Sequence, residues 1–263
     1  MRALALHEDV LLVSSAVLHV NCVIVRGGVL DAEEGEAFVI DSPVLPDELD
    51  ALPALIAQAR FPEPSGLLAT HGDWDHLLGR IAFPGAALGC AESTAERLHA
   101  EPGDAQRALR RFDEELLIER ARPLALGSLQ ALPVPGRCDL GDRELKLHPT
   151  GGHTSDGMAV HIGWAGVLVA GDYLSGVELP TLHDGEVDAY LATLERLRPL
   201  VVQCEHVVSG HGPVLERGRA LAVLDEDVAY LHALRVSGAD AELPAGRRGA
   251  VQRELHAKNV AVI

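Results

Sequence analysis

The sequence predicts an α/β protein folded as a four-layer αββα sandwich, in which two sheets pack face to face and helices cover both outer faces. Short apolar segments rich in β-branched residues alternate with longer amphipathic segments. Their order is strands, helices, strands, helices, in two halves of similar size. Because no linker rich in Pro, Gly or Ser separates the halves, we expect a single domain over residues 1–263, with a C-terminal helical segment over residues 216–263.

The first half begins with strands separated by Gly, Asp and Glu. Leu49, Leu52, Leu55 and Ile56 then recur at helical spacing up to about Arg60, and Pro53 predicts a helix start near it. The strands of this half are expected at 10–15, 20–25, 36–41, 65–70 and 86–90, and its later helices at 91–100 and 104–120.

The second half returns to strands and ends in helices. Its strands are expected at 128–134, 143–150, 158–164, 166–172 and, with the loop that follows, 205–213. An amphipathic helix over residues 185–199 is predicted to stop at Pro199. From about Glu216 the chain is expected to be helical, with Leu221, Leu224, Val228 and Leu231 facing inward.

Charge and cysteine content restrict the classes of partner. Lys and Arg total 22 against 39 Asp and Glu, a formal net charge of -17, which disfavours nucleic acids and anionic membranes. The four cysteines are widely separated, so we expect reduced, buried thiols. His7, Glu8 and Asp9 interrupt the N-terminal apolar stretch, and no segment has membrane-spanning length. A cytoplasmic protein with a small-molecule substrate is expected, and a homodimer is left open.

The stretch ATHGDWDHLLG, residues 69–79, places His71, Asp73, Asp75 and His76 directly after an apolar strand. Residues two apart on extended chain project to the same side, so His71 and Asp73 can share one metal ion. Asp75 and His76 are adjacent and can diverge toward a second ion as the chain turns into a helix. The stretch therefore predicts ligands for two metal ions.

Three later loops supply further ligand types in the same context. His153 lies in GGHTSDG, Asp172 in VLVAGDY and His211 in VVSGHGP. Each follows an apolar strand and has a glycine beside it, which lets the backbone turn tightly and approach an ion. Strand ends are where α/β folds place their chemistry, so we expect these side chains to complete the site.

The ordered set THGDWDH, GGHTSDG, AGD and SGHGP, preceded by Asp41 in AFVIDS, resembles the metallo-β-lactamase superfamily over about residues 10–215. The resemblance implies an αββα sandwich with a dinuclear metal site at the edge where its sheets meet. His71, Asp73 and His153 would hold one ion, Asp75, His76 and His211 the other, and Asp172 would bridge them. Asp75 and Asp172 would be the catalytic carboxylates, around a hydroxide shared by the two ions. Asp41 is expected to fix the loop and not to bind metal.

Asp73 departs from the usual family pattern, H-x-H-x-D-H, which has histidine there. A carboxylate makes the first site harder and more anionic, which suits iron or manganese, although zinc also accepts this set. The flavodiiron branch of the superfamily has a carboxylate at this position, but it also carries a flavodoxin-like domain for which this chain has no room. We expect two divalent ions, zinc first, with iron or manganese as alternatives.

The resemblance implies a metal-dependent hydrolase of a small ester, thioester or lactone. The segment from Asp172 to His211 resembles the glyoxalase II-like branch and a related endoribonuclease branch, and the acidic charge disfavours the latter. Tyr173 and His183 are weaker candidates for substrate contact. Two alternatives stay open: an iron-dependent oxidoreductase of the persulfide dioxygenase or flavodiiron type, and a non-catalytic metal-binding module.

Overall fold

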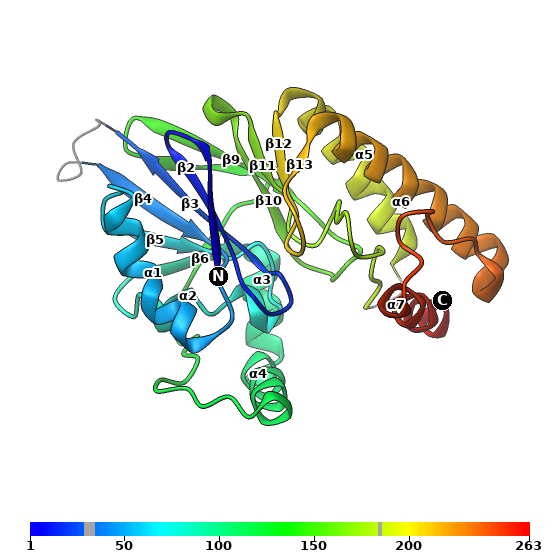
Figure 1. Cartoon of the computed structure of the whole chain (residues 1–263), viewed down its shortest axis with the longest axis horizontal. Coiled ribbons are helices and arrows are strands. Elements are labelled where there is room, and N and C mark those ends of the chain that lie inside the picture. The colour runs from blue at the N-terminus through cyan, green and yellow to red at the C-terminus, as the bar shows by residue number, and fades with distance from the viewer. Residues whose placement is uncertain (29–34, 184–185) are drawn as a thin grey trace.

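Two β-sheets form the middle of the computed structural model, which is described for residues 1–28, 35–183 and 186–263. Helices cover the outer face of each sheet, one group beside the N-terminal half and the other beside the C-terminal half (Figure 1). This arrangement confirms the predicted four-layer αββα sandwich. No helix in the described ranges is both long and apolar enough to span a membrane.

The first sheet is antiparallel from its first to its fourth strand and parallel from there to its seventh. Its strands, in spatial as well as chain order, are β1 Arg2–His7, β2 Val10–Ser14, β3 Asn21–Gly27, β4 Glu36–Ile40, β5 Gly66–Leu68, β6 Ala87–Ala91 and β7 Leu129–Leu132. Strand β1 was not among the predicted strands. It lies at the sheet edge and is mostly exposed, so it lacks the apolar burial on which the other predictions rested.

The helices of the first half are α1 Pro46–Gln58, α2 Gly79–Ala82, α3 Glu92–Ala100 and α4 Asp104–Leu116, with a 3₁₀ turn, η1, at Trp74–His76. The predicted start of α1 near Pro53 was wrong, because the helix begins at Pro46 and runs through Pro53. A proline in the first turn, as Pro46 is, loses no helical hydrogen bond. The Glu48 side chain also accepts a hydrogen bond from the Leu45 backbone N–H, which fixes the true helix start.

The second sheet is mostly antiparallel, with one parallel pair between β11 and β12. Its strands, in spatial order, are β13 Leu215–Glu216, β12 His206–Val208, β11 Val167–Val169, β10 Met158–Ile162, β9 Arg143–Pro149 and β8 Gly136–Leu140. Strands β8 and β13 were not predicted. Much of β8 is exposed and β13 is only two residues long, so neither carries a clear apolar signal.

Helices α5 Val187–Gln203, α6 Arg217–Ser237 and α7 Ala250–Val262 belong to the second half, with 3₁₀ turns η2 Gly163–Ala165 and η3 Gly238–Asp240. Gly185, where the first of these helices was predicted to begin, lies outside the described residues. The predicted stop at Pro199 was wrong, since α5 continues to Gln203. Leu200 and Val201 are buried beyond the proline, and this packing outweighs the hydrogen bond that Pro199 cannot donate.

Alternate residues of the strands divide the core into layers. In β3, Cys22 and Ile24 face the helices of the first half, whereas Val23 and Val25 face the second sheet. The second sheet packs its other face against α5 and α6. A bridge between Val20 and His211 joins the two sheets at one edge, so strand ends from both halves meet there.

Candidate metal centre

The first half places its candidate ligands on the loop that leaves β5 and enters η1. Asp41, at the end of β4, accepts hydrogen bonds from the Thr70 backbone N–H at 2.8 Å and from the Thr70 hydroxyl at 2.9 Å. Its own backbone is left-handed, with φ of 58°, a conformation that Asp adopts more readily than most residues. Asp41 therefore fixes the start of the loop, the role that the sequence predicted for it.

The second half contributes three residues from three separate strand ends. His153 follows β9, Asp172 follows β11 and His211 follows β12. Close packing demands glycine beside two of them. A Cβ on Gly152, whose φ is 109°, would overlap the backbone of α5 at Tyr190, and a Cβ on Gly210 would overlap the Asp172 carboxylate.

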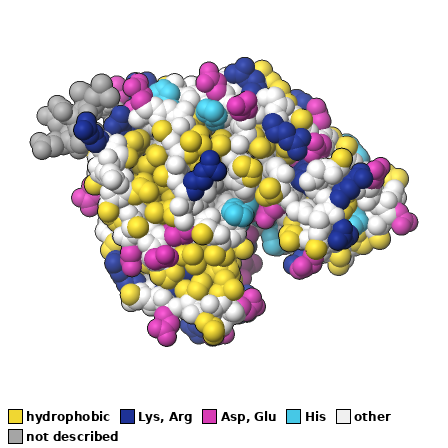
Figure 2. Space-filling view, in the orientation of Figure 1, with side chains coloured by type: hydrophobic (Ala, Val, Ile, Leu, Met, Phe, Trp, Pro, Cys, Tyr) yellow, Lys and Arg dark blue, Asp and Glu magenta, His cyan; other side chains and the backbone are white. Residues whose placement is uncertain are grey.

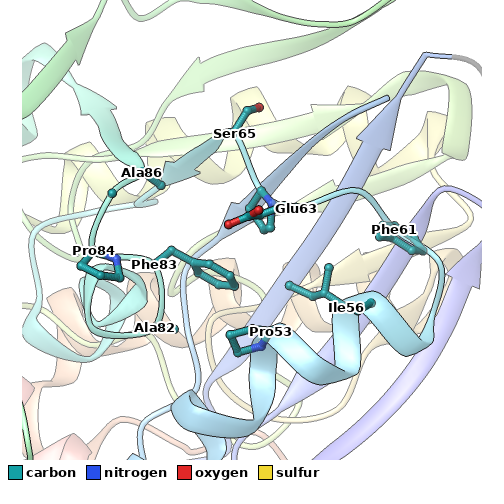
Figure 3. Close-up of a pocket in the computed structure, with 12 residues that line it drawn as sticks. Pro53, Ile56, Phe61, Glu63, Ser65, Ala82, Phe83, Pro84 and Ala86 are labelled. Carbon is teal, nitrogen blue, oxygen red and sulfur yellow. The ribbon is translucent and has the colours of Figure 1, made fainter. Parts of the chain in front are cut away.

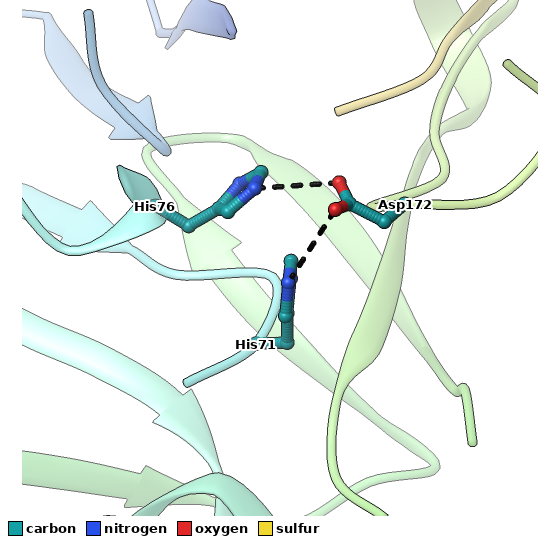
Figure 4. A group of neighbouring side chains, drawn as sticks. All are labelled: His71, His76 and Asp172. Carbon is teal, nitrogen blue, oxygen red and sulfur yellow. Dashed lines mark ion pairs between the residues drawn. The ribbon is translucent and has the colours of Figure 1, made fainter. Parts of the chain in front are cut away.

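Asp172 lies at the centre of the cluster, facing histidines from both halves. Its Oδ1 is 3.3 Å from His76 Nε2, and its Oδ2 is 3.8 Å from His71 Nε2 (Figure 4). The same Oδ2 is 3.3 Å from both His153 Nε2 and His211 Nε2. One carboxylate thus contacts four imidazoles that the sequence separates by up to 140 positions, as the numbering from 71 to 211 shows.

The candidate ligands form three overlapping groups whose ligand atoms lie within 4.8 Å of one another. These groups are His71, Asp73 and His153; Asp75, His76 and His211; and His71, His76 and Asp172. The first two are the sets predicted for the two ions. The structure therefore brings together all seven residues that the sequence singled out as metal ligands, in the predicted grouping.

Each histidine is oriented by a partner at its other ring nitrogen. Nδ1 of His153 lies 3.1 Å from the Thr181 carbonyl oxygen, and Nδ1 of His211 lies 2.9 Å from the Leu18 carbonyl oxygen. A carbonyl oxygen can only accept, so both Nδ1 atoms carry protons and Nε2 is the ring nitrogen that faces the other candidate ligands.

The two histidines of the first half follow the same rule. His76 Nδ1 lies 3.0 Å from the Asp41 carboxylate, and His71 Nδ1 lies 3.1 Å from the Thr70 hydroxyl. The Thr70 hydroxyl already donates to Asp41, so it accepts from His71. All four imidazoles consequently turn Nε2, the nitrogen available to a metal ion, toward the middle of the cluster.

The ligand atoms that face the middle of the cluster suit a bound metal ion. Nε2 of His71, His76 and His153 and Oδ1 of Asp172 are buried and have no hydrogen-bond partner in the described part of the chain. Buried polar atoms are normally paired, because leaving one unpaired costs about 1–3 kcal/mol. Imidazole nitrogens and carboxylate oxygens are ligands of zinc, iron and manganese, so this donor set suits a divalent transition metal.

Electrostatics in the cluster favour a bound cation. Burial opposes the charged form of His211, but Asp172, Asp75 and Glu178 outweigh it and raise the His211 pKa to about 10. The pKa of His76 is also raised, against its burial, by Asp172, Asp41 and Asp75. Burial would raise the pKa of Asp172, yet the surrounding histidines hold it well below its usual range. The carboxylates thus require positive charge, from protons or from metal.

Asp73 contacts Arg97, a residue of the site that the sequence analysis missed. Asp73 Oδ2 lies 3.6 Å from both His71 Nε2 and His153 Nε2, and Asp73 Oδ1 accepts a hydrogen bond from Arg97 at 2.9 Å. Arg97 also binds Asp156, whose carboxylate accepts from the Gly72 backbone N–H. Asp156 stands in GGHTSDG, but Arg97 on α3 is one of many arginines in the sequence, and no local signal marks it.

The two weaker substrate candidates occupy different positions. His183 is half exposed, and its Nε2 lies 3.8 Å from Asp73 Oδ2 at the rim of the cluster. Tyr173 is buried, and its hydroxyl accepts a hydrogen bond from the His153 backbone N–H. Because Tyr173 lies beneath the His153 loop, we assign it a supporting role in place of the substrate contact that the sequence suggested.

A large, mostly apolar pocket lies apart from the candidate ligands. Figure 2 shows histidine and acidic side chains near the hollow where the first half meets the C-terminal helices. A pocket of about 810 Å³ lies instead between the end of α1 and the segment from α2 to β6, lined by Pro53, Ile56, Phe61 and Phe83 (Figure 3). None of the candidate ligands lines this apolar pocket, so its size does not make it the reaction site.

Comparisons with known proteins agree with this geometry. Residues 16–231 match the family model described as the metallo-beta-lactamase superfamily, which confirms the resemblance inferred from the motifs. No protein of curated function matches the sequence.

Solved structures of the same family resemble the chain in fold. A metallo-beta-lactamase family protein from Thermus thermophilus is 21% identical, with a TM-score of 0.68, and the match covers 98% of this chain and 94% of that one. A beta-lactamase domain protein from Burkholderia ambifaria is 17% identical, with a TM-score of 0.66 and coverage of 99% and 87%. The sec-alkylsulfatase Pisa1 from Pseudomonas sp. is 14% identical, with a TM-score of 0.71, and the match covers 99% of this chain but 49% of that one. At these identities the likeness establishes the fold alone.

Proposed function

The chain belongs to the metallo-β-lactamase superfamily, and on that premise we propose that it is a metal-dependent hydrolase of a small ester, thioester or lactone. One observation carries the proposal: the Nε2 atoms of four histidines converge on the Asp172 carboxylate, and three of them are buried without a hydrogen-bond partner in the described structure. A purely structural cluster would pair these atoms with one another or with backbone groups.

Two divalent ions account for the ligand groups. In this proposal His71, Asp73 and His153 would hold one ion, Asp75, His76 and His211 would hold the other, and Asp172 would be shared between them. Zinc is proposed first, since it accepts mixed histidine and carboxylate ligands, with iron or manganese as alternatives. Such ions, when bound, acidify a water between them and polarise the substrate carbonyl.

Asp75 has the position expected of a proton acceptor. Its Oδ2 lies 3.4 Å from His211 Nε2 and 3.9 Å from His76 Nε2, so it borders the central space from the side of the η1 turn. We assign it the role of orienting the attacking water and accepting its proton. The water oxygen bonds to the carbonyl carbon, the ester or thioester bond breaks, and the proton passes to the departing oxygen or sulfur. We assign contact with the substrate to His183, which is half exposed at the rim.

The test is reconstitution of the purified, metal-stripped protein with zinc, manganese and iron in separate samples. Each sample is assayed against thioesters, lactones, phosphodiesters and a β-lactam. We expect hydrolysis of at least one thioester, ester or lactone, its loss in Asp75→Asn, and its retention in the control His99→Gln, whose side chain is exposed on α3. If no substrate is hydrolysed with any of the metals, the hydrolase proposal fails.

A second candidate, an iron-dependent oxidoreductase, is favoured by one observation. The first ligand group contains the Asp73 carboxylate, held in place by Arg97, where the family pattern has histidine. A harder ligand set suits iron. Metal analysis of protein produced without added metals separates the candidates, since stoichiometric zinc would exclude the oxidoreductase and stoichiometric iron would favour it.

A further inference from the structure

The segment between β11 and α5 contacts two candidate ligands. Its residues 175–183 are called the support loop. The Ser175 hydroxyl donates a hydrogen bond to the His211 carbonyl oxygen at 3.0 Å. The Thr181 carbonyl oxygen accepts the Nδ1 proton of His153 at 3.1 Å. The orientation of the His153 imidazole and the backbone position of His211 therefore depend on where this loop lies.

The support loop has no helix or strand of its own, so its backbone groups need partners from elsewhere. Arg247 donates to the carbonyl oxygens of Ser175 at 3.2 Å and Glu178 at 2.7 Å. Gln252 donates to the carbonyl oxygen of Val177 at 2.6 Å. Both partners come from the C-terminal segment, more than sixty positions further along the chain.

Asn259 of α7 completes the set from a fully buried position. Its Oδ1 accepts a hydrogen bond from the Leu182 backbone N–H at 2.9 Å, and its Nδ2 donates to the Pro180 carbonyl oxygen at 2.6 Å. The same Nδ2 lies 3.0 Å from the Tyr230 hydroxyl, which ties α7 to α6. Arg247, Gln252 and Asn259 are together named the C-terminal clamp.

Arg247 is itself held rigidly. Its side chain is buried and forms ion pairs with Asp227 at 2.6 Å and Glu226 at 3.1 Å, both on α6. A buried charge that lost these partners would be strongly destabilising, so the guanidinium has one favourable position. Arg247 thus links the support loop to α6.

We propose that the C-terminal clamp is a positioning device for the metal centre: by fixing the support loop it sets the orientation of His153 and the backbone position of His211. All three clamp residues lie beyond residue 231, where the match to the family model ends. The part that concerns metal affinity rests on the proposed metal binding, whereas the part that concerns the order of the loop does not.

Amide hydrogen exchange on the full chain tests the loop. The informative amides are those of Glu178, which donates to the Ser175 hydroxyl, and His183, which donates to the His153 carbonyl oxygen, because neither is bonded to the clamp. We expect Asn259→Leu to speed exchange at both by about tenfold while strands β3 and β10 are unchanged. The control Lys258→Met alters the exposed neighbour on α7 and should leave both amides as they are.

Zinc affinity, measured by competition with a chelator, tests the link to the metal centre. Asn259 holds Pro180 and Leu182, on either side of the Thr181 carbonyl that orients His153. Displacement of such an outer partner costs about tenfold in metal affinity, so we expect Asn259→Leu to bind zinc about tenfold more weakly and Lys258→Met to match the unaltered protein. Should Asn259→Leu fail to fold, Gln252→Met decides instead, because Gln252 lies at the surface and its loss removes only the bond to Val177. This variant should speed exchange at Glu178 and weaken zinc binding in the same direction.

The outcomes separate this inference from the proposed function. Unchanged exchange at Glu178 and His183, or unchanged zinc affinity, in a folded clamp variant overturns the positioning role. Failure of the unaltered protein to hydrolyse any substrate while it binds zinc overturns the hydrolase proposal alone, because exchange and metal affinity are measured without substrate.

Discussion

The two halves of the molecule supply the metal centre in different ways. The first half contributes His71, Asp73, Asp75 and His76 within six consecutive positions of one loop. The second half contributes His153, Asp172 and His211 from three loops that lie far apart in the sequence. Both halves nevertheless bring their ligand atoms to within 4.8 Å of a neighbour.

The supports of these ligands differ in the same way. In the first half, Asp41 at the end of the adjacent strand β4 holds Thr70 and His76, and Arg97 holds Asp73. In the second half, the support loop holds His153 and His211 and is itself held by side chains from the C-terminus. The comparison teaches that a compact motif can be fixed by a few side chains that contact it directly, whereas the dispersed ligands rest on a loop that distant segments must hold in turn.

Removal of Asp172, the residue that joins the halves, should have the largest effect. Asp172→Ala takes away the carboxylate that faces all four histidines, so we expect the protein to lose at least one bound ion. Metal content by elemental analysis measures this. The control Asp188→Ala changes an exposed aspartate on α5, and retention of both ions in Asp172→Ala would refute a bridging role.

Asp41→Asn weakens the support of the first half without touching a ligand. Asn tolerates the left-handed backbone at this position, but its amide cannot accept all the hydrogen bonds from Thr70 and His76. We expect zinc affinity to fall roughly 10–100-fold, at least as much as in the clamp variants. Asp50→Asn, an exposed change on α1, is the control; an effect of Asp41→Asn smaller than that of Asn259→Leu would reverse the comparison between the halves.

Asp73→His restores the usual family motif and tests whether the carboxylate at this position sets the metal preference. A third imidazole softens the first ligand group, so we expect the ratio of zinc to manganese affinity to rise about tenfold. Competition titrations with the two metals measure the ratio, and Asp73→Asn controls for loss of charge alone. An unchanged ratio would show that the carboxylate does not set metal preference.

The metal-free protein should show a modest pH dependence of stability. His211, with its pKa raised from 6.5 to about 10, contributes stability that is complete below pH 6.5 and is lost as the pH rises through about 10. Asp172, whose pKa lies below 3.8, contributes stability that is lost only in acid. We expect the melting temperature of chelator-treated protein to fall from pH 6.5 to pH 10 and His211→Asn to flatten this decline. A melting temperature that rises over this range would contradict the conclusion that the carboxylates of the metal-free cluster require positive charge.

Much of the fold followed from local patterns, and the differences have physical causes. Buried strands with strong apolar signals, such as β3 and β10, were predicted within a few residues. The edge strand β1 and the exposed strand β8 were missed because backbone pairing, and not burial, defines them. The ends of α1 and α5 were misjudged at Pro53 and Pro199, where packing of the helix against its sheet outweighs the local cost of proline.

The candidate ligands were predictable because they lie in loops that follow apolar strands, and most of them stand beside a glycine. The places of Arg97 and Glu178 beside the cluster could not be predicted, because the sequence around an arginine on a helix or a glutamate in a loop does not indicate a nearby site. The three residues of the C-terminal clamp were even harder to predict from the sequence. They act through hydrogen bonds to backbone groups, which any sequence offers, so only their position in space identifies them.

The sequence by itself predicted the αββα class and the ligand types, because strand periodicity and the chemistry of His and Asp are local properties. The grouping of those ligands around two expected ions was implied by the resemblance to the family. Tertiary structure alone decided which second residue holds each ligand: Asp41 for His76, Thr181 for His153, Arg97 for Asp73. It also decided that α7 reaches the support loop. Those contacts depend on how the two halves and the C-terminal helices pack, which is set by the whole chain and by no single segment of it.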